Sequence, residues 1–236
     1  MGAAEQHNLT SSNTQDLDAL IALQKAQFRA EGKVTYATRI DRLKRLKALI
    51  VENKVEFANT TKREFNGARS YEFSLFSEFA SKVEAIDYSM KHLKAWMKPE
   101  KRQTNKPMNF LGGKGQVRHF PKGVVGIISP WNLPFGLTVA PLTSALAAGN
   151  RALLKPSEFV PETAALFAEV VPKYFSNDEV AVVTGGAEVS QQFAQLPFDH
   201  LLFTGSTRVG AQVMQAASKN LVPVTLELGG KSPVII

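Results

Sequence analysis

Cysteine is absent from the 236 residues, and this absence excludes several kinds of chemistry. Without a thiol, the chain can form no disulfide, no thiolate metal site and no cysteine nucleophile of its own. Long apolar runs are missing too, so we expect neither a membrane span nor a membrane partner. The N-terminal stretch MGAAEQHNLTSSNTQ lacks a signal-peptide core, and Gln6 replaces the Ser or Thr of a myristoylation signal. We expect a cytoplasmic protein without a bound metal.

Basic residues are concentrated in one segment. Nine Lys and Arg lie between Lys91 and Lys122 against one acid, Glu100, and this local excess is larger than the net charge of the chain, +7. Such clusters are usually solvated faces, so we expect no nucleic-acid partner. We assign residues 99–122 to a basic bridging segment with an edge strand near 116–120, which is a candidate oligomerisation strand.

Apolar periodicity predicts a helical part before this segment. Residues 1–15 are polar and predict a disordered tail, and residues 16–98 predict helices. In one helix Ile40, Leu43, Leu46 and Ile50 recur at steps of three and four. In another the same steps run from Phe76 to Met97, and Pro99 ends it.

The pattern changes after Gly123. Apolar, β-branched runs alternate with helix-like stretches that begin near residues 136, 161, 186 and 206. The runs occupy residues 124–128, 151–155, 179–184, 200–203, 223–228 and 232–236. Continuous apolar strands that alternate with helices predict a doubly wound, Rossmann-like parallel sheet in residues 123–236.

Ligands bind such sheets beyond the carboxyl ends of the strands, so the loops there hold the candidate residues. In SPWNLPFG, residues 129–136, two prolines stiffen the loop around Asn132. A rigid amide can donate to a developing oxyanion, and we favour this interpretation over an Asn that satisfies the turn backbone. In KPSE, Lys155 and Glu158 can hold two ribose hydroxyls. Alternatively, Ser157 caps a helix there, and the two interpretations stay open.

Two further loops carry candidates. In TGSTRVG, residues 204–210, free N–H groups at a helix start suit a diphosphate, although a capped helix alone explains this motif better. In TLELGG, Glu227 ends an expected buried strand, where burial raises a carboxyl pKa and prepares it for proton transfer. Its alternative role is a buried hydrogen bond to backbone. The following Gly229 and Gly230 allow close approach of a ligand.

Four motifs together resemble the aldehyde dehydrogenase family. PKGVVGIISPWNLPFGL, AAGNRALLKPSE, FTGSTRVG and LELGGKSPVII stand in the family's order and spacing, and they cover nearly all of residues 121–236. The region 39–98, with KHLKAWMKPEK, resembles the short class-3-like branch, which includes coniferyl-aldehyde-type enzymes. The resemblance implies NAD(P)-dependent oxidation of an aromatic or aliphatic aldehyde to the acid, by a homodimer or homotetramer.

The resemblance also implies a role for each matched residue. Asn132 matches the oxyanion-hole side chain and Glu227 the general base that activates water. The nicotinamide is bordered by Ile128, Pro130, Trp131, Leu228 and Gly229. The remaining cofactor-binding residues are Lys155 and Glu158 at the adenosine ribose, Gly185 at the adenine, and Gly205, Ser206 and Val209 at the diphosphate. For the cofactor, NAD or NADP, Glu158 favours NAD because it would repel a 2′-phosphate, while Lys155 could offset part of that repulsion.

One departure from the family concerns the nucleophile. The family's cysteine thiolate lies a few dozen residues beyond the general base, and this sequence ends before it. The sequence therefore resembles the cofactor-binding half of the enzyme, and we expect cofactor binding without turnover. A designed fragment, a truncated reading frame and an incomplete sequence all remain open as explanations.

Two other functions are less favoured. A non-catalytic nucleotide-binding or interaction module is opposed by the apolar PVII at the expected sheet edge. An acylating, coenzyme A-dependent relative is opposed by Glu227, because such an enzyme has less need of a base that activates water.

Overall fold

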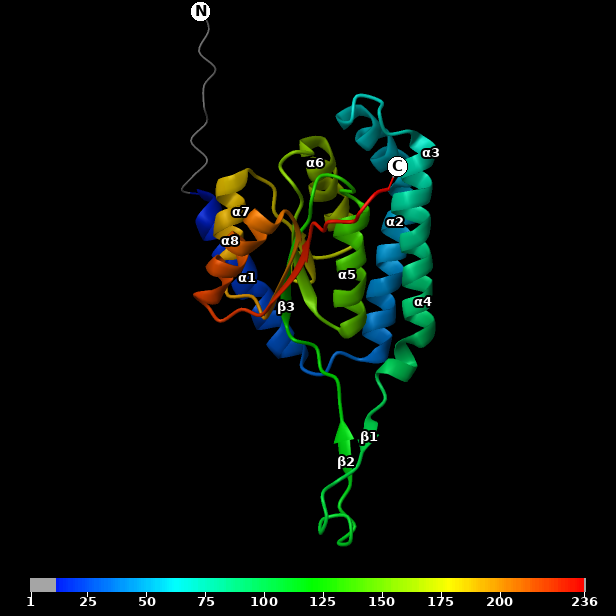
Figure 1. Ribbon diagram of the computed structural model, residues 1–236, viewed down its shortest axis with the longest axis vertical. Coiled ribbons are helices and arrows are strands. Elements are labelled where there is room, and N and C mark those ends of the chain that lie inside the picture. The colour runs from blue at the N-terminus through cyan, green and yellow to red at the C-terminus, as the bar shows by residue number, and fades with distance from the viewer. Residues whose placement is uncertain (1–11, 236) are drawn as a thin grey trace, which may run out of the picture.

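A five-stranded parallel sheet forms the centre of the computed structural model, which describes residues 12–235, with side chains from Leu17 onward (Figure 1). The strands are β3 (Val124–Ile128), β4 (Arg151–Lys155), β5 (Val180–Val182), β6 (His200–Gly205) and β7 (Val224–Leu228). Their order is β5-β4-β3-β6-β7, so the direction of winding reverses between β3 and β6. The predicted doubly wound α/β fold is confirmed.

Helices cover both faces of this sheet. They are α1 (Ser12–Glu31), α2 (Tyr36–Glu64), α3 (Tyr71–Ser74), α4 (Ser81–Trp96), α5 (Gly136–Ala148), α6 (Pro161–Val170), α7 (Ala187–Ala194) and α8 (Thr207–Ser218). A π-helical turn, η1 (Leu75–Ala80), joins α3 to α4, and a 3-10 turn, η2 (Val171–Lys173), follows α6.

Successive residues of the strands point to opposite faces, which explains why the strands are apolar throughout. Val125 and Ile127 of β3 belong to the core formed with α2, α4, α5 and α6. Val124 and Ile128 belong to a second core, formed with α1, α7 and α8. The predicted starts of α5, α6, α7 and α8 all lie within one residue of the observed ones.

Two expectations for the helical part differ from the structure. Helix α1 begins at Ser12, so residues 12–15 of the predicted tail are helical, and residues 1–11 lie outside the described residues. Phe76 is not a core residue, because its side chain is 81% exposed. The π-helical turn η1 adds a residue to one turn and shifts the buried face, which brings Glu78 and Phe79 inside.

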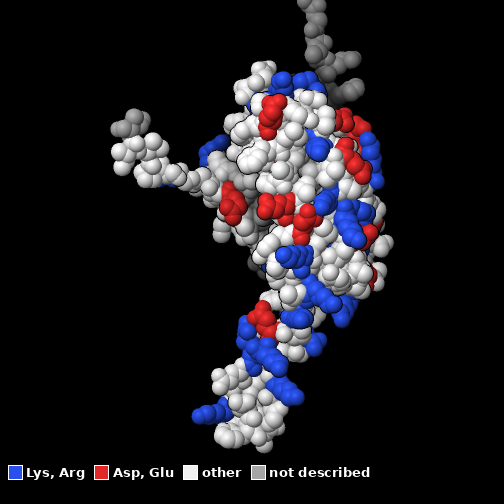
Figure 2. Space-filling view, turned by 90° about the vertical axis from the view of Figure 1, so that its right-hand side faces the viewer, with Lys and Arg blue, Asp and Glu red and all other residues white. Residues whose placement is uncertain are grey.

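The basic segment forms a hairpin that projects from the body of the molecule (Figure 1). Its strands β1 (Glu100–Arg102) and β2 (Gly115–Val117) pair antiparallel, so the expected strand near 116–120 ends earlier, at Val117. Lys and Arg side chains are spread along the hairpin (Figure 2). Apolar side chains at its tip are exposed, namely Met108, Phe110 and Leu111.

The expected strand at 232–236 is wrong for the described residues 232–235. Residues 229–235 have no regular secondary structure, and Val234 and Ile235 are 80% and 98% exposed. An apolar sequence forms a strand only where a neighbouring strand pairs with it. The order of the described sheet ends at β7, and no strand of it pairs with this segment.

A network of ion pairs links helices α1 and α2 to the amino ends of β4 and β5. Its members are Glu31, Arg42, Arg45, Arg151, Asp178 and Glu179. The Arg42 side chain is 2% exposed and contacts Glu31 and Glu179, each at 3.0 Å. Arg151 contacts Glu31 at 2.8 Å and Asp178 at 2.7 Å. We call this set the amino-end network.

Candidate active site

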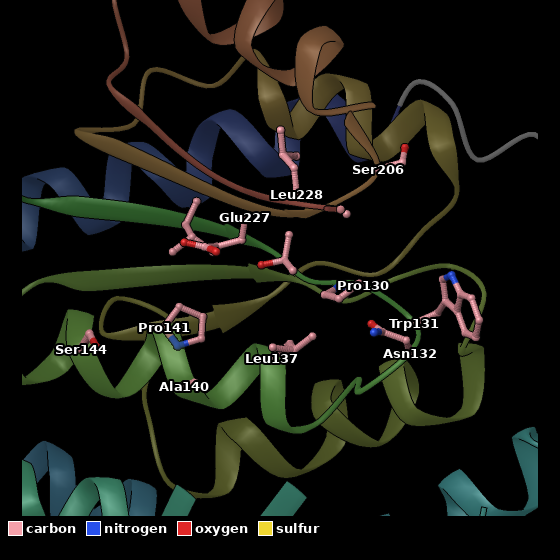
Figure 3. Close-up of a pocket in the computed structure, with 14 residues that line it drawn as sticks. Pro130, Trp131, Asn132, Leu137, Ala140, Pro141, Ser144, Ser206, Glu227 and Leu228 are labelled. Atoms are coloured by element: carbon pink, nitrogen blue, oxygen red, sulfur yellow. The ribbon is translucent and has the colours of Figure 1, made fainter. Parts of the chain in front are cut away.

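A cleft of about 720 Å³ opens where the direction of winding reverses, at the carboxyl ends of β3, β6 and β7 (Figure 3). This is the position at which doubly wound sheets bind ligands. Helix α5 forms one wall through Leu137, Ala140, Pro141 and Ser144. The remaining wall is formed by Pro130, Trp131, Asn132, Leu202, Thr204, Gly205, Ser206, Glu227, Leu228 and Gly229.

The cleft brings together eight of the predicted site residues, in the segments 130–132, 205–206 and 227–229. The other five lie outside it. Ile128 is buried in the core on the α1 side, and Val209 lies in the first turn of α8. Lys155, Glu158 and Gly185 follow or end the neighbouring strands β4 and β5.

Asn132 lies in the loop between β3 and α5, next to Trp131 (Figure 3). Its backbone carbonyl accepts a hydrogen bond from Arg69. Within residues 12–235 its side-chain amide makes no hydrogen bond, so it does not satisfy the turn backbone. Trp131 is 51% exposed, and its ring stacks on that of Phe65 with ring centroids 6.2 Å apart.

Glu227 is exposed, so the expectation that it is buried at a strand end is wrong. The reason is the position of β7 at the edge of the described sheet, which leaves Glu227 and Leu228 uncovered on one side. Its backbone pairs in register with Thr204 of β6. The side chain lines the cleft opposite α5 (Figure 3).

Ser206 caps helix α8 as the sequence predicts, since its Oγ accepts a hydrogen bond from the Val209 amide at 3.3 Å. The α8 amino terminus and its remaining N–H groups therefore adjoin the cleft, where they favour an anion. Packing within the protein already requires glycine at position 205, because a Cβ there would lie 2.5 Å from the Phe203 ring.

Lys155 is buried at the end of β4, with 1% of its side chain exposed. Its Nζ donates to the Pro156 carbonyl at 2.8 Å and lies 3.8 Å from the Glu158 carboxylate. Burial lowers the pKa of Lys155, and the nearby Glu158 opposes this effect. The ammonium group therefore stands beside the first residues of the following loop.

The alternative in which Ser157 caps a helix is wrong. Helix α6 begins only at Pro161, and Ser157 accepts a hydrogen bond from the Phe159 amide within the loop. The first amides of α6 are instead capped by Glu64 of α2, whose Oε1 accepts from Glu162 at 2.6 Å and from Thr163 at 3.2 Å. This cap is nearly 100 residues away in sequence, so the local sequence could not predict it.

Gly185 has φ +140°, a conformation that side chains rarely adopt. A Cβ at this position would lie 2.6 Å from Val189 in helix α7. The glycine therefore lets the chain turn tightly into α7.

Sequence reasoning missed two residues that support the Asn132 loop, Arg69 and Glu78. Glu78 is 1% exposed, and its Oε2 accepts hydrogen bonds from the Phe135 amide at 2.9 Å and the Gly136 amide at 3.0 Å. Burial raises the pKa of Glu78, and hydrogen bonds from Gly136, Arg69 and Phe135 oppose this effect. The sequence carried no signal for this burial, because Glu78 lies off the apolar spacing of residues 76, 79, 83 and 86.

The described residues form neither a metal-binding cluster nor a membrane-spanning helix. Among residues 12–235, no group of three or more His, Asp or Glu side chains is placed to hold a metal ion. None of the helices in this part of the chain is long and apolar enough to cross a membrane.

The parallel sheet, its reversed winding order and the cleft at that point define a Rossmann-like α/β protein. Residues 3–236 match the model of the aldehyde dehydrogenase family. The chain therefore belongs to this family, which confirms the resemblance seen in its four motifs.

Several relatives show the same family membership. A probable coniferyl aldehyde dehydrogenase of Caulobacter vibrioides is 47% identical over 221 residues, which are 93% of this chain and 45% of that protein. A substrate-bound AldH of Staphylococcus aureus has a TM-score of 0.84 and 34% identity, over 92% of this chain and 46% of that one. An NAD+ complex of a Bacillus cereus aldehyde dehydrogenase has a TM-score of 0.79 and 29% identity, over 93% and 44%. The chain spans about half the length of these relatives.

Proposed function

We propose that these residues form the cofactor-binding half of an NAD(P)-dependent aldehyde dehydrogenase, which oxidises an aldehyde to the carboxylic acid. The observation that carries this proposal is the cleft at the reversal of winding, because it joins Asn132, Glu227 and the capped amino terminus of α8. Bound NAD or NADP supplies the hydride acceptor for this reaction.

Asn132 and Glu227 have distinct roles in the proposal. The Asn132 amide donates a hydrogen bond to the oxygen on which negative charge develops. Glu227 takes a proton from the water that releases the acid product. This second role distinguishes the proposal from transfer to coenzyme A, which needs no activated water. The 236 residues contain no cysteine, so the family's thiolate nucleophile would come from residues outside them.

The other site residues would hold the cofactor. The N–H groups at the start of α8 would bind its diphosphate, with Gly205, Ser206 and Val209 forming the turn. Lys155 and Glu158 would hydrogen-bond the adenosine ribose, and Gly185 would adjoin the adenine. Pro130, Trp131, Leu228 and Gly229 would border the nicotinamide, with Ile128 beneath the same loop.

We propose NAD as the preferred cofactor. The Glu158 carboxylate would repel the 2′-phosphate of NADP, and the Lys155 ammonium, 3.8 Å from that carboxylate, would offset part of this repulsion. Side-by-side titration with NADH and NADPH tests this preference. Glu158→Gln should reduce the difference between the two affinities, whereas Glu169→Gln, on the exposed surface of α6, should not. Unchanged selectivity in Glu158→Gln would refute the role of Glu158.

Binding and turnover of the 236-residue chain test the function itself. We expect NADH to bind and quench tryptophan fluorescence, and we expect no oxidation of coniferyl aldehyde or of an aliphatic aldehyde. Failure to bind NADH, NADPH and ADP-ribose would refute the proposed cofactor site. Oxidation of either aldehyde by this chain would refute the argument from the missing thiol. For a protein that also carries the nucleophile, the ratio of kcat/KM for the two aldehydes would define the substrate class.

We also propose that the hairpin of residues 99–122 takes part in a homodimer or homotetramer. It projects from the body, and its tip exposes Met108, Phe110 and Leu111, which are 55%, 85% and 79% accessible. Sedimentation of the wild type and of Phe110→Ser with Leu111→Ser would test this role. An unchanged association state would contradict it. A cytoplasmic location remains a prediction.

A further inference from the structure

A clamp of two charged side chains holds the loop that carries Asn132. Arg69 follows helix α2, and Glu78 lies in the π-helical turn η1, so both come from the helical part of the chain. π-helical turns often mark functional positions, because they turn a side chain out of its regular phase. Here the turn directs a carboxylate into the protein interior, against the start of α5.

Glu78 binds one end of the loop, 130–136. Its Oε2 accepts hydrogen bonds from the Phe135 and Gly136 amides at the start of α5. The N-cap residue of α5 is Phe135, whose side chain has no hydrogen-bond acceptor and cannot cap the helix. The Glu78 carboxylate therefore caps the amino terminus of α5, and its negative charge faces the positive end of that helix's dipole.

Arg69 binds the other part of the loop. One guanidinium nitrogen donates to Glu78 Oε1 at 3.2 Å, and the other donates to the backbone carbonyl of Asn132. The guanidinium also lies over the Phe65 ring at 4.1 Å and near the Phe73 ring at 5.6 Å. Its planar fork is thus held on two acceptors and two aromatic faces at once, which a lysine ammonium cannot reproduce.

Arg69 holds the backbone at Asn132, and Glu78 holds it at residues 135–136, so both ends of the segment 132–136 are fixed. Pinning the Asn132 carbonyl restricts rotation of that residue's backbone, and the direction of its side-chain amide follows from the backbone. We infer that Arg69 and Glu78 are positioning residues that aim the Asn132 amide and the adjacent Trp131 wall into the cleft. This inference rests on the proposed function of that loop at the nicotinamide end of the cofactor.

Ligands of different length separate positioning from simple stability. NADH reaches both ends of the proposed site, whereas ADP-ribose lacks the nicotinamide. Glu78→Gln and Arg69→Lys should weaken NADH roughly fivefold, the effect of about one lost hydrogen bond, and leave ADP-ribose within about twofold. Glu84→Gln, an exposed carboxylate on α4, is the matched control and should change neither affinity. Calorimetric titration of the 236-residue chain measures both ligands.

A second readout does not depend on a ligand. The chain has two tryptophans, so Trp96→Phe leaves Trp131 as the only fluorophore of this kind. In that background, Glu78→Gln and Arg69→Lys should increase the amplitude of the nanosecond motion in the Trp131 anisotropy decay. Glu84→Gln should leave this amplitude unchanged. Using two clamp variants keeps the test decisive if one of them does not fold.

The outcomes separate the clamp from the proposed function. Greater Trp131 motion together with a selective loss of NADH affinity would support the clamp. Equal weakening of NADH and ADP-ribose, or unchanged Trp131 motion with a lower unfolding midpoint, would overturn it and leave a structural ion pair. If the wild type binds neither ligand, the proposed function fails, and the Trp131 motion alone decides the clamp.

Discussion

Replacing Glu179 by Gln should destabilise the protein by about 3 kcal/mol, through loss of one acid from the amino-end network. The Glu179 carboxylate accepts from Arg42 at 3.0 Å and from Arg45 at 2.6 and 3.0 Å. Removing its charge leaves Arg42, which is 2% exposed, with Glu31 as its remaining acidic partner among the described residues. Arg45 is less affected, because it also contacts Asp41 and the Tyr174 carbonyl.

Urea and thermal unfolding measure this loss. For a chain of this length, 3 kcal/mol corresponds to a fall in Tm of roughly 6–12 °C. Glu169→Gln is the matched control, because Glu169 pairs with Lys173 on the surface and is 64% exposed. We expect this control to cost less than about 0.5 kcal/mol. Similar losses in the two variants would refute the reasoning from burial.

The same variant has a predictable pH dependence. Burial raises the pKa of Glu179, but hydrogen bonds from Arg45 and Arg42 outweigh this effect and lower the pKa below 4.5 overall. A carboxylate with a lowered folded-state pKa adds stability above its unfolded pKa, and loses it as the pH falls through the folded value. The urea midpoint of the wild type should therefore fall more steeply below about pH 4.5 than that of Glu179→Gln. Parallel acid profiles would contradict this account.

Three further predictions concern other parts of the fold. Gly123→Ala should lower the free energy of unfolding in urea by roughly 3 kcal/mol, because φ is +136° and a Cβ would lie 2.1 Å from Asp199 Oδ2. The control Gly186→Ala, whose Cβ would meet no atom within 4 Å, should lower it by less than about 1 kcal/mol. Phe57→Ala should cost about 3–5 kcal/mol by the same measurement, since the fully buried ring would leave a cavity. Burial lowers the pKa of Lys155, so wild-type stability should rise with pH towards about 10.5, and Lys155→Met should remove that rise. An unfolding free energy of Phe57→Ala equal to that of the wild type would contradict the second prediction. A rise of stability with pH in Lys155→Met equal to that of the wild type would contradict the third.

The sequence predicted the centre of the sheet well, because β3 and β4 are buried on both faces. Their apolar runs, 124–128 and 151–155, coincide with the observed strands. The four motifs also located the cleft, since the loops that line it follow strands with a clear apolar signature. Both successes depend on local sequence and on the general rule for parallel sheets.

The incorrect predictions concern features that depend on which strands and helices lie beside a segment, and not on the sequence of that segment. The exposure of Glu227 depends on what lies beside β7, and the sequence of β7 does not contain that information. The same applies to residues 232–235, whose apolar character resembles that of a strand. The burial of Glu78 depends on one π-helical turn, which shifts the phase without any change in the apolar pattern.

The amino-end network lies at the opposite end of the strands from the cleft. Its buried arginines fasten α1 and α2 to the starts of β4 and β5, and Asp199 similarly binds the start of β3 through the Val124 amide at 2.8 Å. Loops at the carboxyl ends are not needed for this fastening. Sequence drift in those loops can therefore alter the choice of ligand while the scaffold keeps its shape, so selection can act on specificity and on folding separately.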